Sequence, residues 1–196
     1  MGAYYYLVAQ LPTLTFGGSA PFSVDHFREL CADLLSAEDK PLLDLCVLVP
    51  RNFDEAPDIL PHPILSPLID GWRNWERTLR LNLAKLRFAS LKREGNFPID
   101  PPADPVDAVS AAKGALAFES PWEAEVFLDR SRWTAIEGLM GFDYFGRDTV
   151  FAYMLKLQIL ERQGTLKTEE GFKEYKNLYA SIMEASSNSM VSGEPQ

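Results

Sequence analysis

The two histidines and the two cysteines are the side chains of this sequence best suited to nucleophilic or metal chemistry. They are His26, His62, Cys31 and Cys46. His26 and Cys31 are five residues apart, so on a helix they point to different sides. No pair among the four has the spacing of a zinc site. We expect no catalytic residue, no metal and no cofactor, and we interpret both cysteines as buried, reduced thiols.

Other motifs are equally poor in catalytic signals. The stretch FGGSAP at residues 16–21 contains glycines but lacks the GK[ST] ending of a phosphate-binding loop. Glu123 and Glu125 would lie on different sides of a helix, so they do not form an acid and base pair. The sequence therefore favours a protein that is not an enzyme and acts by contact. An enzyme with an acidic pocket between two lobes is the least favoured alternative.

Charge is distributed unevenly along the chain. The 196 residues carry a net charge of −9, which argues against nucleic acid as the main partner. Residues 70–95 hold seven basic and three acidic side chains, so that segment has a net charge of +4 and the rest of the chain −13. A basic helix on an acidic body could bind an acidic protein surface.

Four arginines define this candidate partner-binding face. Arg73, Arg77, Arg80 and Arg87 follow one another at spacings of four, three and seven, which places them along one side of a helix. The planar guanidinium group suits carboxylates on a partner surface. The sequence leaves open whether these arginines bind a partner or pair with acidic residues of the same chain.

Helix-start signals recur along the chain. SPLI at 66–69, DPVD at 104–107 and SPWE at 120–123 each place an N-cap side chain before a proline at the first helical position. Ser23 and Ser36 are expected to be two further N-caps. Acidic residues three positions after a cap complete capping boxes at Asp39, Asp107 and Glu123.

Glycine marks the expected ends of three helices, at Gly95, Gly141 and Gly164. The stretch YYYLVA at 4–9 has β-propensity but could equally begin a helix. The remaining pattern predicts an all-α fold. Its helices are expected near residues 23–35, 37–48, 67–94, 105–118, 121–139, 147–163 and 168–185.

The predicted helix 67–94 would be ~42 Å long, more than a compact domain of this size needs. Asn82 interrupts its apolar seam, and NFPIDPPADP at 96–105 follows it as a stiff connector. The seam is formed by Leu65, Leu68, Trp72, Trp75, Leu79 and Leu86. We therefore predict a multi-helix bundle of two lobes. Its parts are an N-terminal helical lobe with the long helix (1–95), the connector (96–105), a C-terminal helical lobe (106–185) and a disordered tail (186–196).

An acidic residue lies on the apolar side of the predicted helix 121–139. That side is formed by Trp122, Val126, Trp133, Ile136 and Met140, and Asp129 falls among them. A buried carboxylate needs a partner. We expect Arg132, Arg147 or Arg162 to supply it, and we assign Asp129, Arg132 and Trp133 a structural role. Direct contact of Asp129 with a partner protein is the alternative.

Two resemblances concern the ends of the chain. FLDRSRWTAIEGLMGFDYFGRDTVFAYMLKLQILERQ at 127–163 resembles the helical repeat of the C (or d) subunit of V/A-type ATPases, in which an LD, an aromatic residue and an L..Y..LK..I helix recur. YYYLVAQLPTL at 4–14 and LSAEDKPLLDL at 35–45 resemble a bacterial family, domain of unknown function 2764, whose genes lie within V-type ATPase operons. Together the resemblances cover about residues 1–50 and 120–185.

In that ATPase family the C and d subunits sit between the membrane rotor ring and the central shaft and pass torque without chemistry of their own. The resemblance implies a non-catalytic accessory or central-stalk protein of a bacterial V/A-type ATPase, with part of the C/d fold and with the shaft or the rotor ring as partner. Such a protein would be cytoplasmic and peripheral to the membrane through its complex. In keeping with this, no apolar run could span a bilayer and the first residues lack a secretory signal. A stand-alone helical adaptor or regulator is the alternative.

Overall fold

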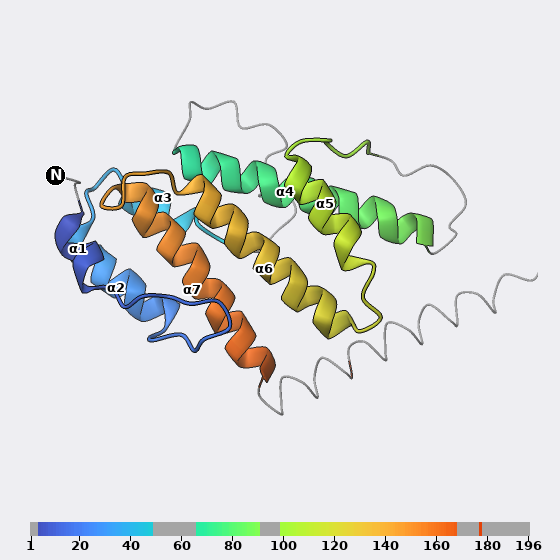
Figure 1. The fold of residues 1–196 in the computed structure, drawn as a ribbon. Coiled ribbons are helices and arrows are strands. Elements are labelled where there is room, and N and C mark those ends of the chain that lie inside the picture. Colours follow the sequence, from blue (N-terminus) through green and yellow to red (C-terminus); the bar gives the residue numbers. More distant parts are fainter. Residues whose placement is uncertain (1–3, 49–65, 91–98, 168–176, 178–196) are drawn as a thin grey trace, which may run out of the picture.

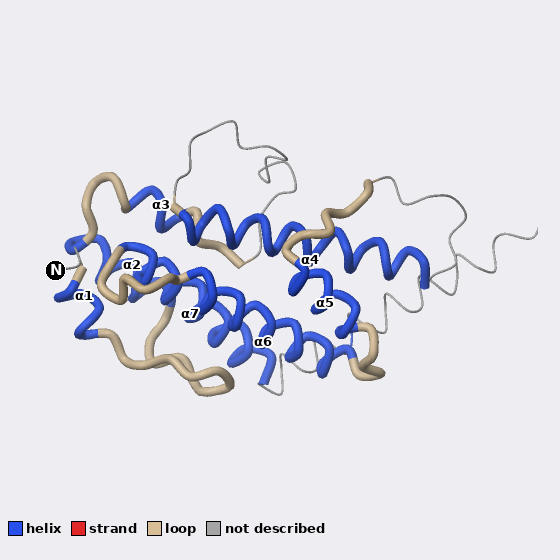
Figure 2. Tube along the Cα trace, turned by 45° about the horizontal axis from the view of Figure 1, so that its top comes forward, coloured by secondary structure: helices blue, strands red, loops and turns tan. Residues whose placement is uncertain are grey.

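The computed structural model describes residues 4–48, 66–90, 99–167 and Asn177. Within these ranges the chain forms seven α-helices and no strand, which confirms the all-α prediction (Figure 2). The helices are α1 (Tyr5–Gln10), α2 (Val24–Leu34), α3 (Lys40–Asp44), α4 (Pro67–Ser90), α5 (Val106–Ala115), α6 (Pro121–Leu139) and α7 (Arg147–Lys167). The expected helix 168–185, the expected stop at Gly95 and the tail 186–196 lie outside the described residues.

Helices α6 and α7 run side by side in the middle of the bundle (Figure 1). Helices α4 and α5 pack against α6 on one side, while α2 covers α7 on the other. Helix α7 packs against α2, α4 and α6, which enclose most of its apolar side chains. Its fully buried side chains are Val150, Phe151, Ala152, Met154, Leu155, Leu157, Ile159 and Leu160. No helix among the described residues combines the length and apolar character needed to cross a bilayer.

Several predicted helix boundaries are confirmed by their caps. The Ser23 hydroxyl accepts from the His26 amide (3.1 Å), and the Ser120 hydroxyl accepts from the Glu123 amide (3.4 Å). Gly141 follows α6 with a φ of 70°, a left-handed conformation that glycine adopts without strain.

Two predicted boundaries are wrong. Gly164 does not end α7, which continues to Lys167, because a glycine inside a helix costs only about 1 kcal/mol and packing offsets it. Asp104 does not cap α5, which begins at Val106 with Pro105 in the N-cap position. The Trp75 indole N–H donates to the carboxylate of Asp107 (2.8 Å), so this carboxylate does not complete a capping box.

The helix expected at 37–48 is much shorter, since α3 spans only Lys40–Asp44. On its N-terminal side, the Asp39 carboxylate accepts hydrogen bonds from the Tyr4 hydroxyl and from Arg147, and not from the backbone N–H at the expected helix start. On its C-terminal side, Gln158 and Trp72 bond the backbone of residues 46–48 and hold it outside any helix.

The connector after α4 is held against that helix by polar side chains three or four residues apart. Thr78 donates to the Asp104 carbonyl (2.9 Å) and Asn82 donates to the Pro102 carbonyl (3.0 Å). One turn further along, Lys85 pairs with Asp100 (2.9 Å). This explains why a polar residue, Asn82, stands in the seam of α4. The seam residues before it (Leu68, Trp72, Trp75 and Leu79) are buried as expected.

The core is one continuous cluster that draws residues from α1 to α7. Residues on both sides of the predicted lobe boundary therefore share it, and the division into two lobes stays a prediction of the sequence. Trp72 and Trp75 stack within this core with ring centroids 5.9 Å apart.

Both cysteines are free and buried, as the sequence predicted. Burial raises the pKa of the Cys31 thiol to about 12 and also raises that of Cys46. The thiolate, which is the reactive form, is thus almost absent at neutral pH.

We expect a thiol reagent at pH 8 to label the folded protein at least roughly a hundredfold more slowly than the same protein in urea, where the thiol pKa returns to its ordinary value near 8.5. Labelling rates followed by mass spectrometry measure this. Equal rates in the two states would mean that the thiols are accessible.

Candidate functional site: a buried ion network beside the basic face of α4

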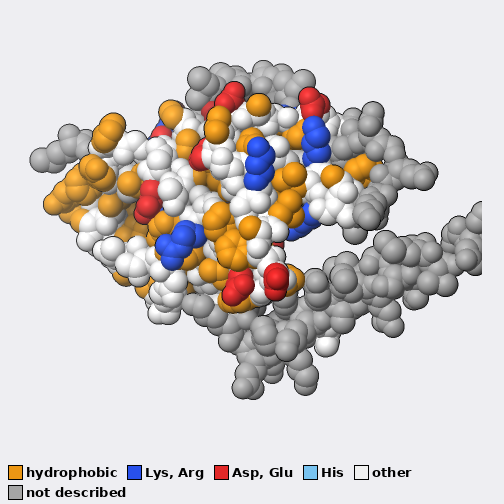
Figure 3. Space-filling model, turned by 45° about the vertical axis from the view of Figure 1, so that its right-hand side comes forward, with side chains coloured by type: hydrophobic (Ala, Val, Ile, Leu, Met, Phe, Trp, Pro, Cys, Tyr) orange, Lys and Arg blue, Asp and Glu red, His pale blue; other side chains and the backbone are white. Residues whose placement is uncertain are grey.

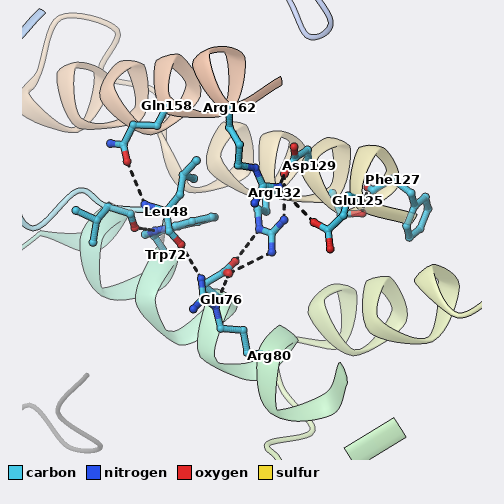
Figure 4. A network of polar contacts seen from close by, with 12 residues as sticks. Leu48, Trp72, Glu76, Arg80, Glu125, Phe127, Asp129, Arg132, Gln158 and Arg162 are labelled. Atoms are coloured by element: carbon cyan, nitrogen blue, oxygen red, sulfur yellow. Dashed lines mark hydrogen bonds and ion pairs between the residues drawn. The ribbon is translucent and has the colours of Figure 1, made fainter. Parts of the chain in front are cut away.

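Asp129 lies at the centre of a buried network of charged side chains. Helix α6 turns Asp129 and Arg132 toward the core, where their side chains are only 2% and 8% exposed. Arg132 Nη1 donates to Asp129 Oδ1 over 3.0 Å. Arg162 from α7 bonds the same carboxylate oxygen, so Asp129 has two guanidinium partners (Figure 4). The predicted pairing of Asp129 with an arginine is confirmed.

A third helix supplies the second carboxylate of the network. Glu76 of α4 is 6% exposed and accepts from Arg132 Nε at 3.0 Å and Nη2 at 3.3 Å. Arg80, one turn along α4, donates to Glu76 over 2.7 Å and to the Leu48 carbonyl over 2.8 Å. Figure 4 shows Arg132 between the two carboxylates, with Glu76 below it and Asp129 above.

Electrostatics keep Arg132 charged in this setting. Burial by itself lowers the pKa of Arg132, but the charges of Glu76 and Asp129 outweigh burial, and the pKa lies above its ordinary value. Each buried carboxylate is bonded to two guanidinium groups. An arrangement of this kind fixes the register of α4, α6 and α7, because sliding any one helix would leave a buried charge unpaired.

Trp133 borders the network and links it to the surface. Its indole N–H donates to Glu137 (2.9 Å), and Lys156 lies over its ring, 4.9 Å from the centroid. Phe16 meets the same ring edge-on at 5.7 Å. Trp133 therefore joins α6, α7 and the loop after α1, and the structural role assigned to it stays a prediction.

The structure separates the four arginines of the predicted binding face. Arg80 is bonded inside the chain to Glu76 and Leu48 and is 33% exposed, so it belongs to the network. Arg73 is half-buried, whereas Arg77 and Arg87 are exposed. Arg80 therefore pairs with an acidic residue of the same chain, whereas a partner-binding role of Arg73, Arg77 and Arg87 stays a prediction.

Arg147, named in the sequence as a third possible partner of Asp129, lies elsewhere. It pairs with Asp39 (3.2 Å) next to the Tyr4 hydroxyl and fastens α7 to the start of α3. Glu76 was missed as a member of the network. Its spacing of four residues before Arg80 was the available signal, but that spacing is typical of ordinary exposed ion pairs.

The described surface includes two shallow hollows, among others. One, of about 150 Å³, lies between α2 and α3 beside Cys31 and Asp44. The other, of about 320 Å³, lies at the start of α6 beside Trp122 and Glu123. Neither brings two carboxylates together. Among the described residues, no group of three or more His, Cys, Asp or Glu side chains is arranged to hold a metal ion.

Comparison with known proteins gives a family match for part of the chain. Residues 115–186, which include α6 and α7, match the family "Protein of unknown function (DUF2764)". No curated protein and no solved structure matches the chain. The matched segment contains the network residues Asp129, Arg132 and Arg162.

Proposed function

We propose that the chain is a non-catalytic accessory or central-stalk protein of a bacterial V/A-type ATPase, similar to the C and d subunits of that family. In this role it contacts the shaft or the rotor ring and transmits force between them. It works in the cytoplasm, peripheral to the membrane through its complex. The observation that carries the proposal is the resemblance of residues 127–163 to the C/d helical repeat, in which the LD pair is Leu128 and Asp129.

The buried network supports a mechanical role. A part that transmits force must keep its helices in register under load. Apolar packing resists sliding only through the fit of the side chains. The contacts of Asp129 with Arg132 and Arg162 add the free-energy cost of leaving a buried charge unpaired when a helix shifts. Arg132 extends the same constraint to Glu76 on α4.

The exposed part of the basic face is the proposed contact surface. Arg77 and Arg87 lie on the same side of α4 and are exposed, whereas the chain as a whole is acidic. Carboxylates of the shaft or of a rotor-ring loop are the complementary chemistry.

Reversing both exposed charges tests this surface. Arg77→Glu with Arg87→Glu should weaken binding to the ATPase at least roughly tenfold, because like charges across an interface repel. Binding of the parent should also weaken as salt rises through the physiological range. Arg80 is left unchanged, since a glutamate there would face Glu76.

The matched control is Lys40→Glu with Lys113→Glu, which changes the net charge equally at exposed positions on α3 and α5. Binding that falls equally in both double variants would reflect net charge rather than the α4 surface. A loss of stability without a loss of binding would end the proposal for this face.

A stand-alone helical adaptor fits the same exposed arginines and remains the second candidate. The two differ in genomic context and in partner. A gene neighbourhood without ATPase genes favours the adaptor, whereas co-purification with ATPase proteins favours the stalk role.

A further inference from the structure

The hollow at the start of α6 is an apolar surface without a cover from the described helices. Its floor is formed by Phe118, Trp122, Val126 and Phe127, with Glu123 and Arg130 at the rim. Phe118 is 39% exposed and its ring packs against that of Phe127 (5.3 Å between centroids). Figure 3 shows hydrophobic side chains gathered near the centre of this side of the molecule, with acidic side chains below them.

The hollow begins a stripe that is buried further along the same helix. Trp122 and Val126 are half-buried, whereas Trp133 and Ile136, which continue the stripe, are enclosed by the core. Half-buried aromatic and branched side chains grouped in this way are typical of a binding surface.

The C-terminal end of α7 lies level with the start of α6, where the hollow is found. Arg162 lies 3.4 Å from Glu125, so the last turns of α7 run level with the first turns of α6 (Figure 1). Lys167 is the last residue of α7, and residues 168–196 follow it. The chain therefore leaves α7 level with the start of α6, where the hollow lies, and has ample length to reach it.

The sequence after α7 has the pattern of an amphipathic helix. Asn177, on the polar side of that pattern, is helical and exposed. Residues 118–130 and 168–185 both fall inside the 115–186 match, so one family model spans the hollow and this segment. The apolar residues of the segment, which share one side of a helix, are Phe172, Tyr175, Leu178, Tyr179 and Ile182.

We propose that the hollow is the docking site of residues 168–185 of the same chain, which turn back near Gly171 and pack their apolar side on Trp122 and Val126. A tethered segment has a high effective concentration at its own docking site. Docking of a second copy would instead bring together two chains that each have a net charge of −9, and these would repel each other. The proposal does not depend on the ATPase role.

Trp122 is a natural probe of docking, because the other tryptophans, Trp72, Trp75 and Trp133, are buried. In the full chain, Leu178→Asp with Ile182→Asp should roughly double the accessibility of Trp122 to acrylamide, since a half-buried indole would lose its cover. The Trp122→Phe variant identifies the contribution of Trp122. The matched control, Asn177→Asp with Ser181→Asp, adds the same charge to the opposite side and should leave quenching unchanged.

A second measurement locates the contact. Glu123→Cys should form a disulfide with Tyr175→Cys and should not form one with Asn177→Cys; native Cys31 and Cys46 are buried. Equal quenching in the parent and in the Leu178/Ile182 variant, or an equal increase in the control, would overturn the proposal. So would the absence of a cross-link preference for residue 175.

Discussion

Asp129→Ala is expected to lower the free energy of unfolding by about 3–5 kcal/mol, the usual cost of removing one partner of a buried ion pair. The cost arises because Arg132, which is 8% exposed, loses one of its two carboxylate partners, and Arg162 loses its buried one. Chemical denaturation of the parent and the variant measures the loss. Asp129→Asn keeps the size of the side chain, so a similar loss in that variant would attribute the effect to charge rather than to a cavity.

Asp100→Ala is the matched control for this change. Asp100 also pairs with a basic residue, Lys85, but it is almost fully exposed. Its removal should change stability by less than about 1 kcal/mol. An Asp129→Ala variant that unfolds like the Asp100→Ala variant would contradict the buried network.

Glu76→Ala is expected to be similarly costly, and its cost should depend on Arg132. In a double-mutant cycle, Glu76→Ala and Arg132→Met should show a coupling energy of about 1–3 kcal/mol, because the two side chains bond directly in the core. The Glu76 and Arg80 pair should couple by less than about 1 kcal/mol, since Arg80 is one-third exposed and keeps its bond to Leu48.

A larger coupling energy for Glu76 with Arg80 than for Glu76 with Arg132 would show that the network is centred on the α4 pair instead of on Arg132. Replacing Glu76, Asp129 and Arg132 together by Leu, Leu and Met should cost much less than the sum of the single changes, because no buried charge is left unpaired among the three.

The pairing inside α6 could be predicted from the sequence because it is local. Asp129 interrupts an apolar stripe, and Arg132 follows one turn later, so helical geometry alone brings them together. Glu76 lies 56 residues before Arg132, and only the packing of α4 on α6 joins the two. The charges of the side chains alone do not indicate which distant acidic residue pairs with which arginine.

The same limit explains the start of α5. DPVD has the local design of a capped helix, but Thr78 holds the Asp104 carbonyl and Trp75 takes the Asp107 carboxylate. Contacts with α4 therefore outweigh the local capping preference. Asn82, the polar residue that interrupted the seam of α4, was a visible sign of this contact, although its partner, Pro102, could not be read from spacing.

Co-purification from native membranes tests the central proposal most directly. The full chain, tagged and expressed at its natural level, should enrich the catalytic and shaft proteins of the V/A-type ATPase, and the Arg77→Glu, Arg87→Glu variant should enrich them much less. If the tagged parent, folded and stable, enriches none of these proteins over an untagged control, the chain is not a component of that ATPase.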